Sequence, residues 1–515
     1  MKRHLIVISI IVLISLLLGA GLQAWLGPGN FAPGGLAAAL LVAIGGGALY
    51  ASWRLAGGGR ALAWIVFLAF ALRLGFGAAM TSAMPVVGYP QPEQQAGYLS
   101  KDAYARDKQA WELGSSTEAL TQAFDSKKYS SDQYGGLLAL SALVYRVLSP
   151  DAHRAYLILI LAAFFAALGI PFFWAAVRQR WGSTAALVGA WILALYPESV
   201  FWGASQMREP FLISLIAVGL WGAVNLPRRR APALAALGIC LAGLLVFSLN
   251  VGLATAGVLA MWIWLEFISG REKPIWRLAG WLSLAAGGVL LIGATLPWLL
   301  SASWLDIYST KMSSGWVEIY VKLVGNQLSA LVVTVYGLIR PLLPAAIFET
   351  SILSWKLIFT WRALGWYLLL PVLIYGLLAM WHAPDGKDRR QLIWTGLVIV
   401  IWTLIASYRG GGDTSDNPRY RVIFLVWMAL LAGWAWSWAQ THGFRWLIRW
   451  GVVDAIFLLF FTQVYLSRYV HLFPTINLNI IFALIGLLSL GVMAGGWWSD
   501  RRKNLKPSST TGHPV

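Results

Sequence analysis

Acidic and basic side chains gather in a few polar segments of a sequence that is otherwise strongly apolar. A carboxylate can act as a general base, and the forked guanidinium of arginine can bind phosphate oxygens. Together, such groups could take a proton from an acceptor and hold an anionic leaving group. The candidates lie at three places in the chain: Asp102 and Asp107; Glu198, Arg208 and Glu209; Arg419, Tyr420 and Arg421.

The segment 97–113 carries the two aspartates. Tyr104, Asp107 and Trp111 recur at i, i+3 and i+7, a spacing that predicts a helix. Because Asp102 lies five residues before Asp107, the two carboxylates are expected on neighbouring but distinct faces. Such a helix could lie on a membrane with its aromatic face in the interface. The simpler alternative, which the spacing alone favours, is a solvated loop helix.

The other candidates also have simpler explanations. Glu198 and its neighbours could form a local ion-pair network, and the two arginines after the glycines 410–412 could anchor the next span in lipid headgroups. Arg73 and Asp454 fall within apolar windows, where ionisable groups are functional candidates by default. Arg73 could equally snorkel outward.

The elements that position these residues are expected to be membrane helices. The chain has 515 residues, of which 59% are hydrophobic and 12% charged, whereas a soluble domain carries about 25% charged residues. We therefore expect an all-α polytopic membrane protein with about fourteen spans. The apolar windows fall at 5–26, 36–53, 62–80, 155–177, 183–199, 210–226, 231–248, 250–268, 278–299, 363–381, 391–408, 422–440, 447–466 and 478–496.

Two further apolar runs are not expected to span. The stretch 137–148 is too short, so it predicts a surface helix like that of 97–113. The run 328–346 is interrupted by Arg340, Pro341 and Pro344, so it is interpreted as re-entrant or interfacial.

The basic residues set the expected orientation. The net charge is +18, but the Lys and Arg residues lie at the ends of apolar windows rather than in a stripe, so nucleic acid is not an expected partner. They collect in alternate connections, which predicts that both termini and the tail 500–515 are cytoplasmic in a cell membrane. The segments 81–136, 300–362 and 409–421 then lie outside. The first window could equally be a signal peptide, although an uncleaved span is favoured.

Metal and disulfide chemistry find little support in the sequence. The single cysteine, Cys240, excludes an internal disulfide, and the six histidines lack ligand spacing. No cofactor is expected with certainty, and a bound divalent cation is left open.

In these features the chain resembles the GT-C glycosyltransferases, polytopic enzymes that include protein O-mannosyltransferases and aminoarabinose transferases. The matching positions are Leu72-Arg73, Asp102 with Tyr104 and Ala105, Tyr134 to Leu148, Pro197 with Arg208-Glu209, and Pro418-Arg419-Tyr420. The likeness implies a GT-C-like module over 61–499, preceded by two additional helices within 1–60.

The resemblance also implies an activity, which is sugar transfer from a polyprenyl-phosphate donor to an acceptor at the outer face of the membrane. Asp102 is the first candidate for the base and Asp107 the second, because the first outer loop lacks the two adjacent acids of the family. Candidate substrate-binding residues are Arg73, Tyr104, Glu198, Arg208, Glu209, Arg419, Tyr420 and Arg421. Glu198 and Glu209 could orient the acceptor or hold a cation. The alternatives are a transporter or lipid flippase, and an O-antigen polymerase or ligase.

Overall fold

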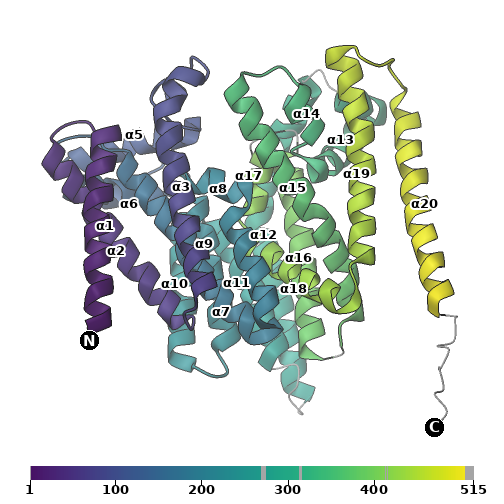
Figure 1. Ribbon diagram of the computed structural model, residues 1–515, viewed down its shortest axis with the longest axis horizontal. Helices are drawn as coiled ribbons and strands as arrows, with labels where there is room; N and C mark the ends of the chain where they lie inside the picture. The colour runs from purple at the N-terminus through teal and green to yellow at the C-terminus, as the bar shows by residue number, and fades with distance from the viewer. Residues whose placement is uncertain are drawn as a thin grey trace, which may run out of the picture.

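The chain folds into a bundle of helices (Figure 1), seen in a computed structural model that describes residues 2–267, 274–312, 316–384, 386–411, 413 and 416–504. Within these residues there is no strand. Among the same residues, eleven helices are long and apolar enough to cross a membrane, or up to 12 if the bent pair α17–α18 is one span. The expected all-helical, multi-pass architecture is therefore confirmed at this level.

The first half of the chain contains ten α-helices and one 3-10 turn. They are α1 (Lys2–Leu26), α2 (Phe31–Leu55), α3 (Arg60–Val87), α4 (Pro92–Gln95), α5 (Lys101–Ser115), η1 (Leu120–Phe124), α6 (Gly136–Leu148), α7 (Tyr156–Leu195), α8 (Pro197–Gly203), α9 (Glu209–Asn225) and α10 (Arg230–Phe247).

The second half contributes the remaining helices. They are α11 (Leu249–Phe267), α12 (Pro274–Met312), α13 (Trp316–Ile339), α14 (Leu343–Phe348), α15 (Leu353–Ala379), η2 (Met380–His382), α16 (Lys387–Gly410), α17 (Asp416–Val422), α18 (Leu425–His442), α19 (Arg445–Tyr465), η3 (Leu466–Val470) and α20 (Leu478–Asn504).

The span count differs from about fourteen for identifiable reasons. Helix α7 runs over two expected windows in 40 residues, α9 is a buried helix of only 17 residues, and α17 meets α18 at an angle of 68°. Every residue of α9 except Trp221 is buried, so its apolar surface contacts other helices rather than lipid. Apolar windows alone cannot distinguish these cases from straight spans.

A bend at Gly182 turns α7 into two packed limbs. Gly182 adopts φ 87°, a conformation that favours glycine, and the helix reverses there. A methyl group on Gly189 would lie 2.6 Å from Phe173 Cε1, so the two limbs are in close contact. The bend returns the end of α7 to the level of α3.

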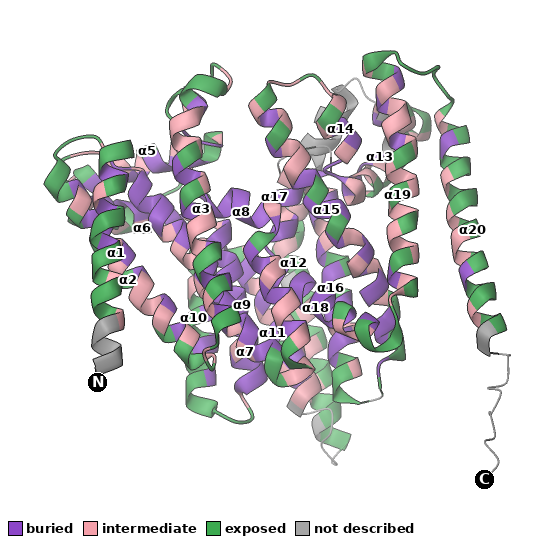
Figure 2. Cartoon of the chain, viewed as in Figure 1, coloured by how far each residue is buried: buried purple, intermediate pink, exposed green. Residues whose placement is uncertain are grey.

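The outermost helices expose their apolar side chains. In the spanning window of α12 none of the residues is buried, and in α20 only 6% are, compared with 72% in α7. Figure 2 shows buried residues concentrated in the middle of the bundle and exposed ones along α1 and α20. Exposed apolar faces of this extent are expected where helices contact lipid.

The segment 300–362 is not the loop that its polar residues suggested. Helix α12 continues to Met312, because residues 298–312 contain no glycine or proline to end it. The apolar run 328–346 is divided as its proline pattern predicts. Its helical part, Leu328–Ile339, is too short to cross a bilayer, and α14 follows the break at Arg340.

The bundle has two distinct ends. Helices α5, α6, α8 and α17 lie in the upper half of Figure 1, which we call the α5 face. The α2–α3 turn, the bend of α7 and the α9–α10 turn lie at the opposite end, which we call the basic face. Helix α1 begins and α20 ends toward this basic face. The expected tail is described only as far as Asn504, where α20 ends.

Candidate functional site

Arg419 joins acidic residues from three distant parts of the chain. Its Nη1 lies 2.8 Å from Asp102 Oδ2, and its Nε lies 2.6 Å from Glu209 Oε1. A third carboxylate, that of Asp416, is 3.7 Å away. The Arg419 and Glu209 side chains are 7% and 1% exposed, whereas that of Asp102 is 55% exposed. Arg419 and Glu209 therefore form the buried part of the cluster, and Asp102 forms its one exposed side.

Helix beginnings place the two acids. Ser100 caps α5 by accepting a hydrogen bond from the Ala103 amide at 3.2 Å, so Asp102 falls in the first turn. Glu209 opens α9, with Pro210 directly after it. Carboxylates at helix N-termini are favoured by the helix dipole, and proline fits the first turn. Arg419 reaches both acids from α17, the short helix set at an angle to α18.

Two further arginines add positive charge beside Asp102. Arg106 donates to the Gln206 carbonyl at 3.3 Å and lies 3.8 Å from Asp132. The guanidinium of Arg208 lies over the Tyr134 ring at 4.8 Å. Burial alone would raise the pKa of Asp102. The charges of Arg419, Arg106 and Arg208 together lower the pKa by more than burial raises it, so the pKa lies below the ordinary value. Asp102 is therefore ionised at neutral pH.

Some polar atoms of this cluster are left for a ligand. Glu209 Oε2 and Arg208 Nε are buried, and neither has a hydrogen-bond partner among the described residues. Buried polar atoms are nearly always hydrogen-bonded in native proteins. A bound molecule that donates to Glu209 and accepts from Arg208 would satisfy both.

A small cavity adjoins the cluster on the side of Arg208. Tyr134, Arg208, Arg409 and Tyr420 contribute to its wall, together with Trp402. Arg208 lies over the ring of Tyr134, and Arg409 lies 5.0 Å over the ring of Tyr420. The cavity therefore presents two guanidinium groups held on aromatic faces.

Asp107 has a structural role rather than the proton-accepting role that its sequence position suggested. It is 2% exposed and accepts hydrogen bonds from Tyr145 at 2.6 Å and Tyr98 at 2.7 Å. His153 Nε2 lies 2.8 Å from the same carboxylate. Burial and the nearby Asp107 charge raise the pKa of both tyrosines, which therefore keep their protons and donate. With its oxygens occupied, Asp107 has no position open to an acceptor.

The aromatic face of α5 packs against other parts of the protein. Trp111 stacks on His153 with ring centres 5.3 Å apart, and it meets the edge of Tyr145 at 5.7 Å. Tyr104 contacts the ring of Tyr98 at 5.3 Å. The expected surface helix 137–148 is present as α6, and it provides the packing partner for this face.

Glu198 belongs to a separate buried ion pair. Its two oxygens accept from Arg362 Nη2 at 2.6 Å and Nε at 2.8 Å, and both side chains are 1% exposed. Trp202 donates to the same carboxylate at 2.6 Å. Glu198 is thus not grouped with Glu209 in the Arg419 cluster.

Arg73 neither snorkels outward nor lines the cavity. It is 1% exposed and donates to the carbonyls of Leu193 at 2.8 Å and Ala194 at 2.9 Å, and to Ser199 Oγ at 2.9 Å. It therefore caps the last turn of α7, where carbonyls lack helical partners and a positive charge is favoured.

The two residues that follow Arg419 point to different parts of the protein. Arg421 lies 3.5 Å over the ring of Trp366 and donates to the Arg340 carbonyl at 2.8 Å, so it faces the interior. Tyr420 lines the small cavity described above. Of the three residues, Arg419 and Tyr420 are near Arg208, and Arg421 serves packing.

Several residues of these networks were not among the sequence candidates. Arg362 lies directly before the apolar window 363–381, and no spacing in the sequence links it to Glu198. Asp416 stands three residues before Arg419, a helical spacing that could have signalled it. Nothing in the sequence marks Arg106, Arg409 or His153, because only the fold brings them to their partners.

The described residues hold no group of three or more His, Cys, Asp or Glu side chains that could bind a metal ion. Scanned against models of protein families, the chain has no match, and no curated protein matches its sequence. Any function must therefore be argued from the chain's own residues.

Proposed function

We propose that this protein is a membrane glycosyltransferase that moves a sugar from a polyprenyl-phosphate donor to an acceptor at the α5 face, on the outer side of the membrane. The observation that carries the proposal is the contact of Arg419 with both Asp102 and Glu209. One guanidinium links a partly exposed carboxylate to a buried one, across sequence separations of 317 and 210 residues. A phosphate binder and a base are thereby adjacent.

The proposed reaction begins when the donor phosphate takes the place of Asp102 on Arg419. Arginine binds phosphate oxygens with its forked donors, and Arg208 supplies a second guanidinium on the cavity side. Glu209 accepts a hydrogen bond from Arg419 Nε, so the arginine keeps its orientation while its Nη1 changes partner. Asp102 is then free to meet the acceptor.

The transfer itself exchanges one bond for another. Asp102 takes the proton of the acceptor's hydroxyl or amine, whose oxygen or nitrogen forms a bond to the anomeric carbon of the sugar. The bond from that carbon to the phosphate oxygen breaks, and its electron pair leaves with the lipid phosphate. Arg419 and Arg208 stabilise the charge that develops on this leaving group.

The test is sugar transfer by purified, reconstituted protein in which Asp102→Asn is compared with Glu112→Gln. Both substitutions remove one carboxylate from α5, but Glu112 is exposed and forms no salt bridge with any residue that the structure describes. We expect Asp102→Asn to lower turnover by about 10²–10⁴-fold while donor binding persists, and Glu112→Gln to have no effect. Arg419→Ala should weaken donor binding as well as turnover.

An unchanged rate for Asp102→Asn would refute the assignment of the base.

The same assay separates the proposal from its alternatives. A carrier or flippase moves the lipid across the bilayer without breaking the bond between sugar and phosphate. Intact donor accumulating on the far side, with no product, would identify that activity instead.

A further inference from the structure

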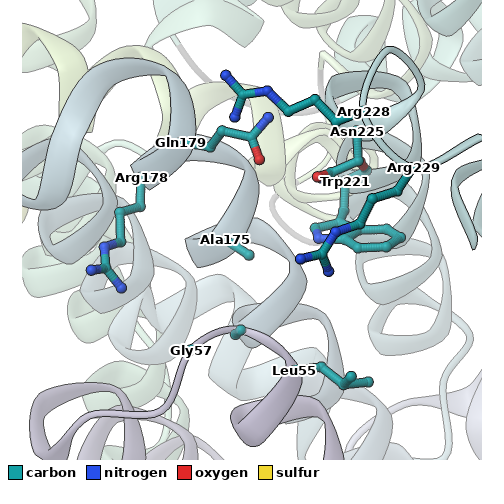
Figure 3. A pocket seen from close by; sticks show the side chains of 10 residues that line it. Leu55, Gly57, Ala175, Arg178, Gln179, Trp221, Asn225, Arg228 and Arg229 are labelled. Carbon is teal, nitrogen blue, oxygen red and sulfur yellow. The ribbon is translucent and has the colours of Figure 1, made fainter.

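A second polar cavity lies at the basic face, away from the Arg419 cluster. It measures about 360 Å³ and is formed where the α2–α3 turn, the bend of α7 and the α9–α10 turn meet. This volume is within the range of small-molecule sites, roughly 300–1,000 Å³. Figure 3 shows Arg178 on one side of the cavity and Arg229 on the other, with Arg228 beside Gln179.

The charge of this cavity is uncompensated. Arg178, Arg228 and Arg229 all line it and are exposed, and within the described part of the chain none of them forms a salt bridge. Arg180, only two residues from Arg178, shows the contrast, because Glu266 and Asp388 bind it at 2.5 and 2.8 Å. No acidic residue lines the cavity. Three positive charges with no counter-charge favour an anionic ligand.

The local backbone adds to this preference. Helix α10 begins at Arg230, directly after Arg229, so the positive end of its dipole lies next to the cavity. The backbone amides of Arg228 and Arg229 both donate to the Asn225 carbonyl, at 3.0 and 2.9 Å, which orders the turn that carries the two arginines. The arginines are thus held by an ordered turn rather than by a free loop.

We infer that this cavity binds the phosphate headgroup of an anionic phospholipid in the leaflet at the basic face. Arginine forks match phosphate oxygens, and basic pockets between membrane helices suit such headgroups. The surroundings favour a lipid over a soluble phosphate. Leu55 lines the cavity and is 75% exposed, and Trp221 is partly exposed beside it, so an acyl chain has an apolar surface to follow. This inference is independent of the proposed transferase activity.

The experiment compares two triple variants of the full-length protein. Arg178→Gln, Arg228→Gln and Arg229→Gln together remove the charges of the cavity. The matched control, Arg54→Gln, Arg60→Gln and Arg230→Gln, removes the same number of exposed charges from the α2–α3 and α9–α10 turns of the same face but leaves the lining of the cavity unchanged. Each protein is placed in bilayer discs of phosphatidylglycerol and phosphatidylcholine, and retained lipid is counted by native mass spectrometry.

We expect the parent and the control to retain a phosphatidylglycerol molecule that the cavity variant binds at least about tenfold more weakly, since only the cavity variant loses the arginines that line the site. Gln179→Glu, which adds a negative charge to the cavity wall, should weaken binding in the same direction. This second variant leaves all three arginines in place.

Equal losses in both triple variants would overturn the inference, because general surface charge would then suffice. Retention of phosphatidylcholine as strong as that of phosphatidylglycerol would do the same. A third arm tests the source of the phosphate. If inorganic phosphate binds the lipid-free parent and displaces phosphatidylglycerol, the ligand is a soluble anion and the lipid assignment is wrong.

Discussion

Asp102 and Asp107 share helix α5 but have opposite surroundings. Asp102 is half exposed and paired with one arginine, whereas Asp107 is enclosed by two tyrosines and a histidine. A base must be reachable by its substrate, and its proton-accepting oxygen must not be permanently occupied. Only Asp102 satisfies both requirements, since its partner Arg419 has a second anchor in Glu209.

The pH dependence of transfer should report the pairing of Asp102 with Arg419. Because the pKa of Asp102 is lowered, its carboxylate stays ionised from neutral pH through the ordinary aspartate range, and base catalysis fails only as the pH falls through the lowered value. The kcat/KM for transfer, which reports the free protein in which Asp102 is still paired with Arg419, should therefore stay level down to about pH 4, the usual aspartate pKa being about 3.9.

Arg419→Gln should move this acidic limb to higher pH, since burial then raises the pKa of Asp102 with less opposition. Arg419→Lys keeps the charge and should leave the limb near its parental position. A profile of kcat/KM against pH for the three proteins gives the comparison. An identical limb in Arg419→Gln would show that Asp102 is not the titrating group.

At the scale of elements, short helix α8 is the structural junction of the α5 face. Glu198 in α8 binds Arg362 in α15, and Pro197 lies against Gly365, where a methyl group would come within 2.5 Å of it. Arg73 of α3 reaches Ser199 of the same helix. Two long helices, α3 and α15, are therefore held to α8, and the chain reaches Arg208 and Glu209 shortly after this short helix ends.

Breaking the Glu198–Arg362 pair should destabilise the protein. Arg362→Met leaves a buried carboxylate without its partner, at a cost of about 3–5 kcal/mol. Adding Glu198→Gln removes that charge and should recover part of the loss. Thermal unfolding in detergent, measured for both single variants and the double variant, gives the coupling. A parental melting temperature for Arg362→Met would contradict the structural role assigned to the pair.

Sequence patterns foresaw most of the helices and only part of the site. Apolar periodicity placed α5 and α6 within a few residues, because a helix is a local structure. The role of Arg73 could not be foreseen, since it depends on the bend at Gly182, which brings the end of α7 back to α3. The burial of Asp107 likewise depends on residues 98, 145 and 153, which only the packing of α5 against α6 brings together.

Across the whole molecule, the arginines at the α5 face and those that line the cavity at the basic face have different surroundings. At the α5 face Arg419 and Arg106 lie near acids, whereas at the basic face Arg178, Arg228 and Arg229 line a cavity without any. Uncompensated basic residues collect on the cytoplasmic side of membrane proteins. We therefore expect the basic face to be cytoplasmic and the α5 face to lie outside.

Cysteine labelling checks this orientation. Cys240 is buried, so it should give little background. Ser115→Cys, at the exposed end of α5, should react with an impermeant reagent added to intact cells, and Arg230→Cys at the basic face should react only after the cells are opened. The reverse pattern would invert the topology and end the proposal of outer-face transfer.

The pairing of Glu209 with Arg419 has a consequence for the biosynthesis of the chain. The arginine follows the carboxylate by 210 residues, and a ribosome that adds roughly 5–20 residues per second needs about 10–40 s to reach it. During that interval α9 exists without its counter-ion, and a lone carboxylate in lipid is costly. The growing chain must therefore keep Glu209 protonated or in contact with water until α17 emerges. A protein truncated before Arg419 would be left with an unpaired acid at the beginning of α9.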